Sequence, residues 1–205
     1  KQDYMSMGAL SKAACKNDSR LFGGYFVLGD NITVNGGMSE FVDRTVTDFN
    51  GNGSQGFCGV IDGKGYVISG LTKTTNNGNA FISVMHRDGV LKNIGFVNAS
   101  FEANEGSFLV HTGAGTVQNV YVQYNKISGA SPDGYSGTLY NANLKVNRLV
   151  VDVTSTQISG NGNKFLLMTD NREADLKNFI CLFGDNYSLQ DVESGKVTIE
   201  SNQDF

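Results

Sequence analysis

One six-residue phrase recurs along the chain, and it constrains the fold more than any other feature. It reads LKNIGF at residues 91–96, VQNVYV at 117–122, VNRLVV at 146–151 and LKNFIC at 176–181. A second phrase reads AFISVM at 80–85, SFLVHT at 107–112, GTLYNA at 137–142 and KFLLMT at 164–169. Successive copies are 26, 29 and 30 residues apart for the first phrase and 27, 30 and 27 for the second. Such a spacing predicts repeated units of about that length.

Apolar side chains occupy every second position within the first phrase, as Ile94 and Phe96 do on either side of Gly95. This period of two is typical of a strand and not of a helix. Parallel stacking of the units gives two inward columns, Ile94–Val120–Leu149–Phe179 and Phe96–Val122–Val151–Cys181. One unit cannot bury such a face alone, whereas several stacked units share a core. The sequence therefore predicts an all-β fold, a right-handed parallel β-helix.

Asparagine recurs in the middle of the first phrase, at Asn93, Asn119 and Asn178. The third copy departs, with Arg148 at that place and Asn147 one residue earlier. Asparagine tolerates turn conformations, and its amide can hydrogen-bond to a neighbouring copy or to turn backbone. We therefore predict equivalent bends joined by stacked amides, with a structural role.

The two ends of the chain differ from the repeats. Residues 25–34 and 59–71 fit the first coils, with Gly and Asp turns between their strands. Residues 3–15 predict a short helix, so residues 1–20 are expected to cap the open strand edge of a β-helix domain spanning 21–205. Residues 197–200 are expected to be followed by a capping loop or by more of a longer chain, and the start at Lys1 predicts a processed protein or an excised segment.

Composition restricts the partners of the chain. It carries 16 Lys and Arg against 20 Asp and Glu, a net charge of −4, without a basic run. Nucleic acid and anionic membranes need a concentrated positive field, so neither is expected as a partner. No apolar stretch approaches the ~18 residues of a membrane-spanning helix. Three cysteines allow at most one disulfide, and pairing of Cys15 with Cys58 stays open.

Residues 24–33, GYFVLGDNIT, and 57–71, FCGVIDGKGYVISGL, carry a resemblance to a known family. Together with the later LKN strands, this pattern resembles the GLUG-repeat surface proteins of bacteria, closely over Leu21 to Val122 and loosely beyond. The resemblance implies a pectin-lyase-like right-handed β-helix in a secreted or wall-anchored adhesion protein. It implies a polysaccharide or a host cell-surface component as partner, and it carries no catalytic residues to transfer.

Two short motifs lie between the first coils. Gly51, Gly53 and Gly56 form a G-x-G-x-x-G, but they lead into a strand and not into the helix that a dinucleotide site needs, so we interpret them as a loop. Asp48, Asn50 and Asn52 resemble the start of a calcium loop. Its twelfth position would be Gly59 instead of a glutamate, so calcium is at most a weak ligand there and no other cofactor is expected.

Candidate metal and nucleophile residues are few. Alignment of Phe81 with Phe108 places His86 and His111 diagonally on one face, near Asp88. Two histidines and one carboxylate are not a convincing set of metal ligands. Cys181 falls in an inward column, which predicts an inert buried thiol.

A polysaccharide lyase or glycoside hydrolase is the alternative function, since hydrolases need two carboxylates flanking the scissile bond. The outward columns of the first phrase read Lys92, Gln118, Asn147, Lys177; then Gly95, Tyr121, Val150, Ile180; then Val97, Gln123, Asp152, Leu182. Only Asp152 is acidic among them. The other acids considered are expected in turns as solvated charges: Asp62, Asp88, Glu102, Glu105, Asp133, Asp170 and Glu173.

Glycan binding without catalysis fits these columns better. Tyr121, Gln123 and Asp152 form a candidate patch, with Tyr124, Tyr135 and Tyr140 in nearby loops. The alternative is that the tyrosines simply favour strand packing. Together with what the resemblance implies, the columns predict a non-catalytic extracellular binding, adhesion or spacer module of a bacterial surface protein.

Overall fold

A computed structural model describes most of the repeat region of the protein. The described residues are 21–37, 56–74, 80–129, 136–139, 142–162, 165, 174–183 and 197–200. The expected capping helix at 3–15 and the calcium-loop residues Asp48, Asn50 and Asn52 lie outside them. Within the described part, all fourteen regular elements are β-strands.

The strands follow one another coil by coil. The first two coils contain β1 (Leu21–Phe22), β2 (Tyr25–Val27), β3 (Ile32–Gly37), β4 (Gly56–Phe57), β5 (Val60–Asp62) and β6 (Val67–Lys73). The next two contain β7 (Ile82–Met85), β8 (Val90–Phe101) and the long β9 (Gly106–Ile127). The last contain β10 (Ser136–Leu139), β11 (Ala142–Val153), β12 (Gln157–Ile158), β13 (Ala174–Phe183) and β14 (Val197–Glu200).

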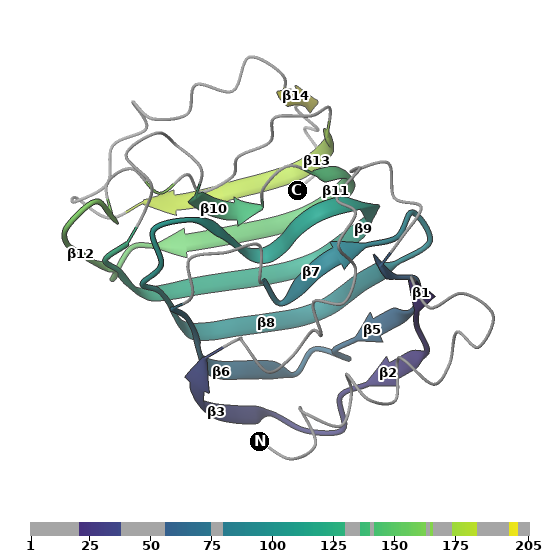
Figure 1. Ribbon diagram of the computed structural model, residues 1–205, viewed down its shortest axis with the longest axis horizontal. Coiled ribbons are helices and arrows are strands. Elements are labelled where there is room, and N and C mark those ends of the chain that lie inside the picture. The colour runs from purple at the N-terminus through teal and green to yellow at the C-terminus, as the bar shows by residue number, and fades with distance from the viewer. Residues whose placement is uncertain are drawn as a thin grey trace.

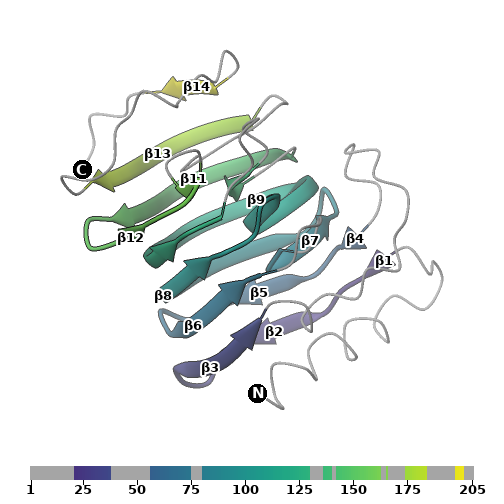
Figure 2. The ribbon, with the colours of Figure 1, turned by 60° about the vertical axis from the view of Figure 1, so that its left-hand side comes forward.

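Each pairing between these strands is parallel, and the pairs form three faces. The first face contains β1, β4, β7, β10 and the start of β9. The second contains β2, β5, β14 and the first parts of β8, β11 and β13, with the middle of β9. The third contains β3, β6, β12 and the later parts of β8, β9, β11 and β13. The strands stack from β3 to β13 in chain order (Figures 1 and 2), so the predicted parallel β-helix is confirmed.

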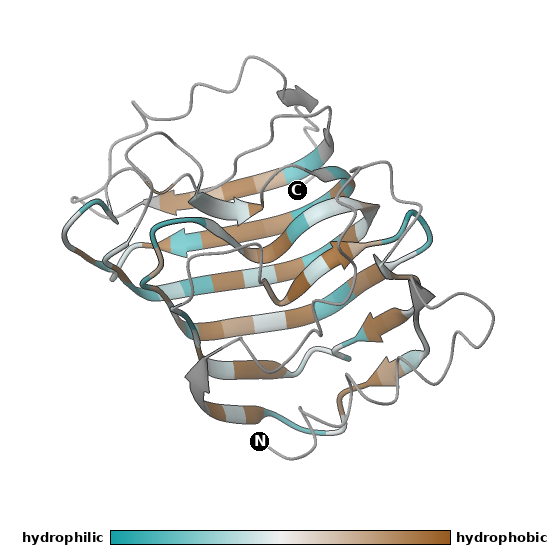
Figure 3. Ribbon diagram, in the orientation of Figure 1, coloured by the Kyte–Doolittle hydropathy of each residue, from teal (hydrophilic) through white to brown (hydrophobic). Residues whose placement is uncertain are grey.

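The register confirms the predicted inward columns residue by residue. Val120 pairs with Ile94 on one side and with Leu149 on the other, and Leu149 pairs with Phe179. The three inner members are at most 3% exposed, whereas Phe179 is partly buried against the same core. Apolar residues consequently recur at matching levels of neighbouring strands (Figure 3).

A run of aromatic rings fills the interior between the faces. Phe96 contacts Phe81 and Phe108 with ring centroids 4.7 and 5.8 Å apart, and Phe108 contacts Tyr124 at 5.3 Å. These pairs are edge-to-face, a favourable arrangement for aromatic quadrupoles. Tyr124 is fully buried, and its hydroxyl meets Thr138 Oγ1 at 3.0 Å. The expectation that Tyr124 lies in a surface loop is therefore wrong.

The predicted alignment of the second phrase is wrong by one residue between its first two copies, whereas the pairing of Gly137 with Ser107 begins the next alignment as predicted, before a register shift at Leu139. Ile82 pairs with Val110, which places Phe81 level with Leu109 instead of Phe108. The cause is a difference in turn length. Between the first and second faces, residues 86–89 form a four-residue turn in one coil, whereas residues 114–115 suffice in the next. His86 consequently begins a turn while His111 stays in a strand, so the two do not share the predicted face.

We expect Leu149→Ala to destabilise the fold by about 3 kcal/mol, because it empties a fully buried position between two neighbouring coils. Val150→Ala is the matched control, since the next side chain points outward and is only partly buried. It should cost less than about 1 kcal/mol. Urea unfolding followed by circular dichroism measures both, and equal losses would contradict the inward and outward assignment.

Candidate functional site

The second and third faces meet at a bend that is repeated in every coil from β8 to β13. Asn93, Asn119, Arg148 and Asn178 hold it with φ of 54°, 52°, 58° and 54°. This left-handed backbone is costly for most side chains, and asparagine is among the residues that adopt it most readily. The predicted equivalence of these four positions is thus confirmed, including the substitution of arginine in one coil.

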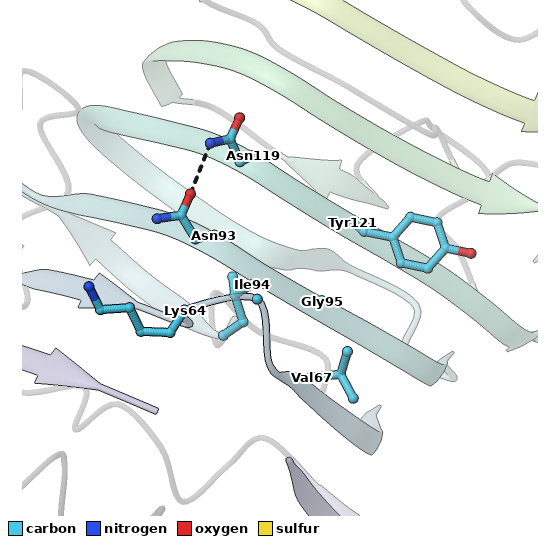
Figure 4. A pocket seen from close by; sticks show the side chains of 8 residues that line it. Lys64, Val67, Asn93, Ile94, Gly95, Asn119 and Tyr121 are labelled. Carbon is cyan, nitrogen blue, oxygen red and sulfur yellow. Dashed lines mark hydrogen bonds between the residues drawn. The ribbon is translucent and has the colours of Figure 1, made fainter. Parts of the chain in front are cut away.

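Side chains at the bend form a hydrogen-bonded ladder that crosses four coils. Arg148 Nη1 donates to Asn119 Oδ1 at 3.3 Å, and Asn119 Nδ2 donates to Asn93 Oδ1 at 2.8 Å (Figure 4). Asn93 Nδ2 in turn donates to Asp62 Oδ1 at 3.0 Å. We call these four residues the amide ladder; it runs from a guanidinium to a carboxylate, so each bond is oriented in the same direction. The predicted stacking of amides is confirmed.

Asp62 ends the amide ladder and is 2% exposed. Its carboxylate also accepts from Lys64 N at 3.0 Å and from the Tyr25 hydroxyl at 3.2 Å. The ammonium groups of Lys64 and Lys92 lie 3.4 and 3.5 Å from Oδ2. The hydrogen bond from Asn93 is the main reason that the pKa of Asp62 lies well below its ordinary value, and Lys64 adds to it despite the opposing effect of burial. The expectation of a solvated turn charge is therefore wrong.

A groove opens on the outer side of this bend. Val67, Gly95 and Tyr121 follow one another in an outward column of the third face. Gly95 has no side chain, and a Cβ there would lie only 2.7 Å from Val67 Cγ1, so the Val67 side chain takes part of that space. The groove has a volume of about 610 Å³ and is lined by Lys64, Gly65, Val67, Asn93, Ile94, Gly95, Asn119 and Tyr121. In Figure 4 the Tyr121 ring stands at one end and Lys64 at the other.

The Tyr121 ring is held in place by Asp152 from the next coil. Its hydroxyl donates to Asp152 Oδ2 at 2.7 Å, while Asp152 Oδ1 accepts from the Thr154 amide at 3.0 Å and hydroxyl at 2.7 Å. Burial, assisted by the Asp152 carboxylate, raises the pKa of Tyr121 to about 12. Burial also favours a higher pKa for Asp152, but the bonds from Tyr121 and Thr154 outweigh it and lower that pKa. The pair is therefore a neutral phenol donating to a carboxylate at neutral pH.

Gln123 does not join the predicted patch. Its Nε2 donates to the Tyr124 carbonyl at 3.1 Å, and its Oε1 accepts from the Asn98 amide at 2.9 Å. This amide therefore supports a second left-handed residue, Asn98, whose φ is 49°. Of the three predicted glycan-binding residues, Tyr121 lines the groove, Asp152 positions Tyr121, and Gln123 supports backbone.

The groove was not predicted from the sequence, although Gly95 could have indicated it. Gly95 occupies an outward column position where the coils above carry Tyr121 and Val150. Gly95 lines the groove together with its column neighbours Val67 and Tyr121. Lys64, which lines the groove, comes from the longer turn between β5 and β6.

The side chains that line the groove are apolar, amide, phenol and ammonium groups. None of its eight lining residues is acidic, and none is histidine or cysteine. In the described ranges no cluster of three His, Cys, Asp or Glu could hold a metal ion. Burial raises the pKa of the Cys181 thiol to about 12, as an inert inward cysteine requires.

Comparison with protein-family models, with curated proteins and with solved structures found no match to this chain. The resemblance of its first coils to the GLUG-repeat proteins therefore stays an expectation from the quoted strands and turns. In the part of the chain that the structure describes, no helix has the length and apolarity to cross a membrane. Functional interpretation consequently depends on the groove and its neighbours.

We expect Asp62→Asn to remove part of the acid sensitivity of the fold. Because the folded-state pKa of Asp62 lies below its ordinary value of 3.8, its charge contributes stability above about pH 4 that is lost as the pH falls through the folded pKa. The melting temperatures of wild type and variant should differ most above about pH 4 and converge below it.

Asp88→Asn is the control for loss of one carboxylate, since the Asp88 side chain is 75% exposed in a turn. A difference between wild type and Asp62→Asn that stays constant across this acid range would contradict the role given to Asp62.

Proposed function

We propose that this chain is a non-catalytic glycan-binding module of an extracellular bacterial surface protein. The observation that carries the proposal is the placement of the Tyr121 ring beside Gly95, with the amides of Asn93 and Asn119 along the same groove. The extracellular setting and the surface protein come from the GLUG-like resemblance. The expected partner is a polysaccharide or a glycan of a host cell surface.

The lining matches the two kinds of surface that a sugar ring presents. One face of a pyranose is made of C–H groups, which pack against an aromatic ring, and its edge carries hydroxyls, which bond to amides. The Nδ2 groups of Asn93 and Asn119 each use one hydrogen in the amide ladder, so each retains a second hydrogen. A pocket of apolar walls with a few placed polar groups is the usual form of a small-ligand site.

Preorganisation of the groove favours binding. The bond from Tyr121 to Asp152 fixes the phenol ring before any ligand arrives, and Asp152 is itself held by Thr154. The lining backbone belongs to paired parallel strands and to the bends between them. Binding to such a surface requires little ordering of side chains, which lowers the entropic cost of association.

The lyase or hydrolase alternative finds less support at this groove. A glycoside hydrolase needs an acid on each side of the bond that it cleaves, and the lining supplies none. The two nearby carboxylates already accept hydrogen bonds that hold the site together: Asp62 ends the amide ladder and Asp152 holds Tyr121. Their positions favour binding over cleavage.

We expect Tyr121→Ala to weaken glycan binding about tenfold, as loss of an aromatic contact does. Tyr121→Phe is the matched variant, because it keeps the ring and removes only the bond to Asp152, and it should retain most of the affinity. An array of bacterial and animal glycans identifies ligands for the wild type. Titration calorimetry then compares the variants.

Leu182→Ala controls for loss of an exposed apolar side chain, since Leu182 is 40% exposed and lies outside the groove. Equal affinity of wild type and Tyr121→Ala would show that the groove is not the site. Release of oligosaccharides from an intact polymer would favour the enzyme alternative.

A further inference from the structure

We infer that the groove selects anionic glycans, with a carboxylate or sulfate group of the ligand at the Lys64 end and a sugar ring against Tyr121. This inference rests on the proposed function and adds the chemical class of its ligand. Three features of the described residues carry it: the local charge, the surplus of hydrogen-bond donors, and the engagement of the neighbouring acids.

Local charge at the groove is opposite to the charge of the whole chain. The protein has a net charge of −4, yet Lys64, Lys92 and Arg148 gather around the bend. The Lys64 side chain is 53% exposed and lines the groove, and Lys92 is 32% exposed. Both ammonium groups approach the same oxygen of Asp62, so one carboxylate faces two cations. The surplus positive charge attracts an anion.

Hydrogen bonding in the groove is also one-sided. The amide ladder has one direction because it starts at Arg148, which can only donate, and ends at Asp62, which can only accept when ionised. The Oδ1 atoms of Asn93 and Asn119 each accept one ladder bond and keep a second lone pair, so each amide still offers one donor and one acceptor. The Lys64 ammonium adds only donors. This excess of donors favours a ligand rich in acceptor oxygens.

The neighbouring acids do not oppose an anionic ligand at the Lys64 end. Asp62 is 2% exposed, behind Asn93 and Lys64. Asp152 accepts three hydrogen bonds, from Tyr121 and Thr154, and does not line the groove. In Figure 4 Lys64 and Tyr121 lie at opposite ends of the groove, and the Lys64 side chain points away from the ring, so the acidic group belongs to a different sugar unit of the oligosaccharide from the one against Tyr121.

The test compares oligosaccharides that differ only by a carboxylate or a sulfate, immobilised as matched pairs. The wild type should bind the charged member about fivefold more tightly, and Lys64→Gln should abolish that difference. Lys126→Gln is the control for loss of one positive charge, since Lys126 pairs with Glu102 away from the groove; it should bind like the wild type. The preference should vanish as ionic strength rises from about 0.01 M to about 1 M, where the Debye length shrinks from about 30 to about 3 Å.

Separate results contradict the two proposals. Equal binding of charged and neutral members, lost in Tyr121→Ala, overturns the anionic preference and leaves glycan binding intact. No binding to any glycan overturns both. Duplex DNA immobilised on the same surface tests for general attraction to polyanions. If the protein binds DNA as strongly as the best charged glycan, the inference is overturned. The carboxylate and sulfate arms then show which acidic group the Lys64 end prefers.

Discussion

Parallel backbone pairing in register is the interaction on which the rest of this structure depends. It places each residue of one coil directly beside its counterpart in the next, as Ile94, Val120 and Leu149 are placed. An apolar column is buried only because both neighbours are apolar at the same level. The same rule carries the polar features, since side chains at the bend hydrogen-bond to side chains at or next to the bend of the adjoining coil. Stability and site therefore arise from one geometric repeat.

The candidate site arises where the repeat varies. Asparagine on asparagine continues the amide ladder, and the exchange to Asp62 at one end and Arg148 at the other gives the ladder its polarity. The groove lies beside Tyr121, where the neighbouring coil carries Gly95 at the paired outward position. In the proposed function, the β-helix supplies a rigid frame, and single departures from its pattern supply the groups that contact the glycan. Function at such a site depends on a few residues and not on the whole face.

The period of two predicts the long strands of the second and third faces correctly. Alternation over six residues determines which side chains point inward, so the amino-acid sequence is enough to stack Phe96 on Val122. The first two copies on the first face are misaligned by one residue because the strands are short and the connections differ in length, as residues 86–89 and 114–115 do. The shared phenylalanine wrongly suggests that Phe81 and Phe108 are paired. The two rings instead contact Phe96 from neighbouring positions in the core.

The site is predicted less completely for a related reason. The outward columns place Tyr121 and Asp152 on one face, where they hydrogen-bond to each other. Gln123 instead holds backbone at the bend of Asn98, which its own strand does not reveal. Asp62 is expected to be a solvated charge in a turn. It is instead buried and accepts a hydrogen bond from Asn93, 31 residues away in the chain. A groove or a buried charge depends on side chains from several neighbouring coils, so the residue pattern of one strand cannot predict it.

The most direct measurement of this account is a disulfide cross-link across the register. Lys92 and Gln118 are pairing partners, and parallel neighbours lie about 4.8 Å apart, within the span of a disulfide. In a background with the native cysteines replaced by alanine, Lys92→Cys with Gln118→Cys should oxidise readily and give a linked peptide by mass spectrometry. Lys92→Cys with Thr116→Cys, two residues out of register, should stay reduced. Preferential linking of the second pair would contradict the stacking of coils from which the fold and the groove are derived.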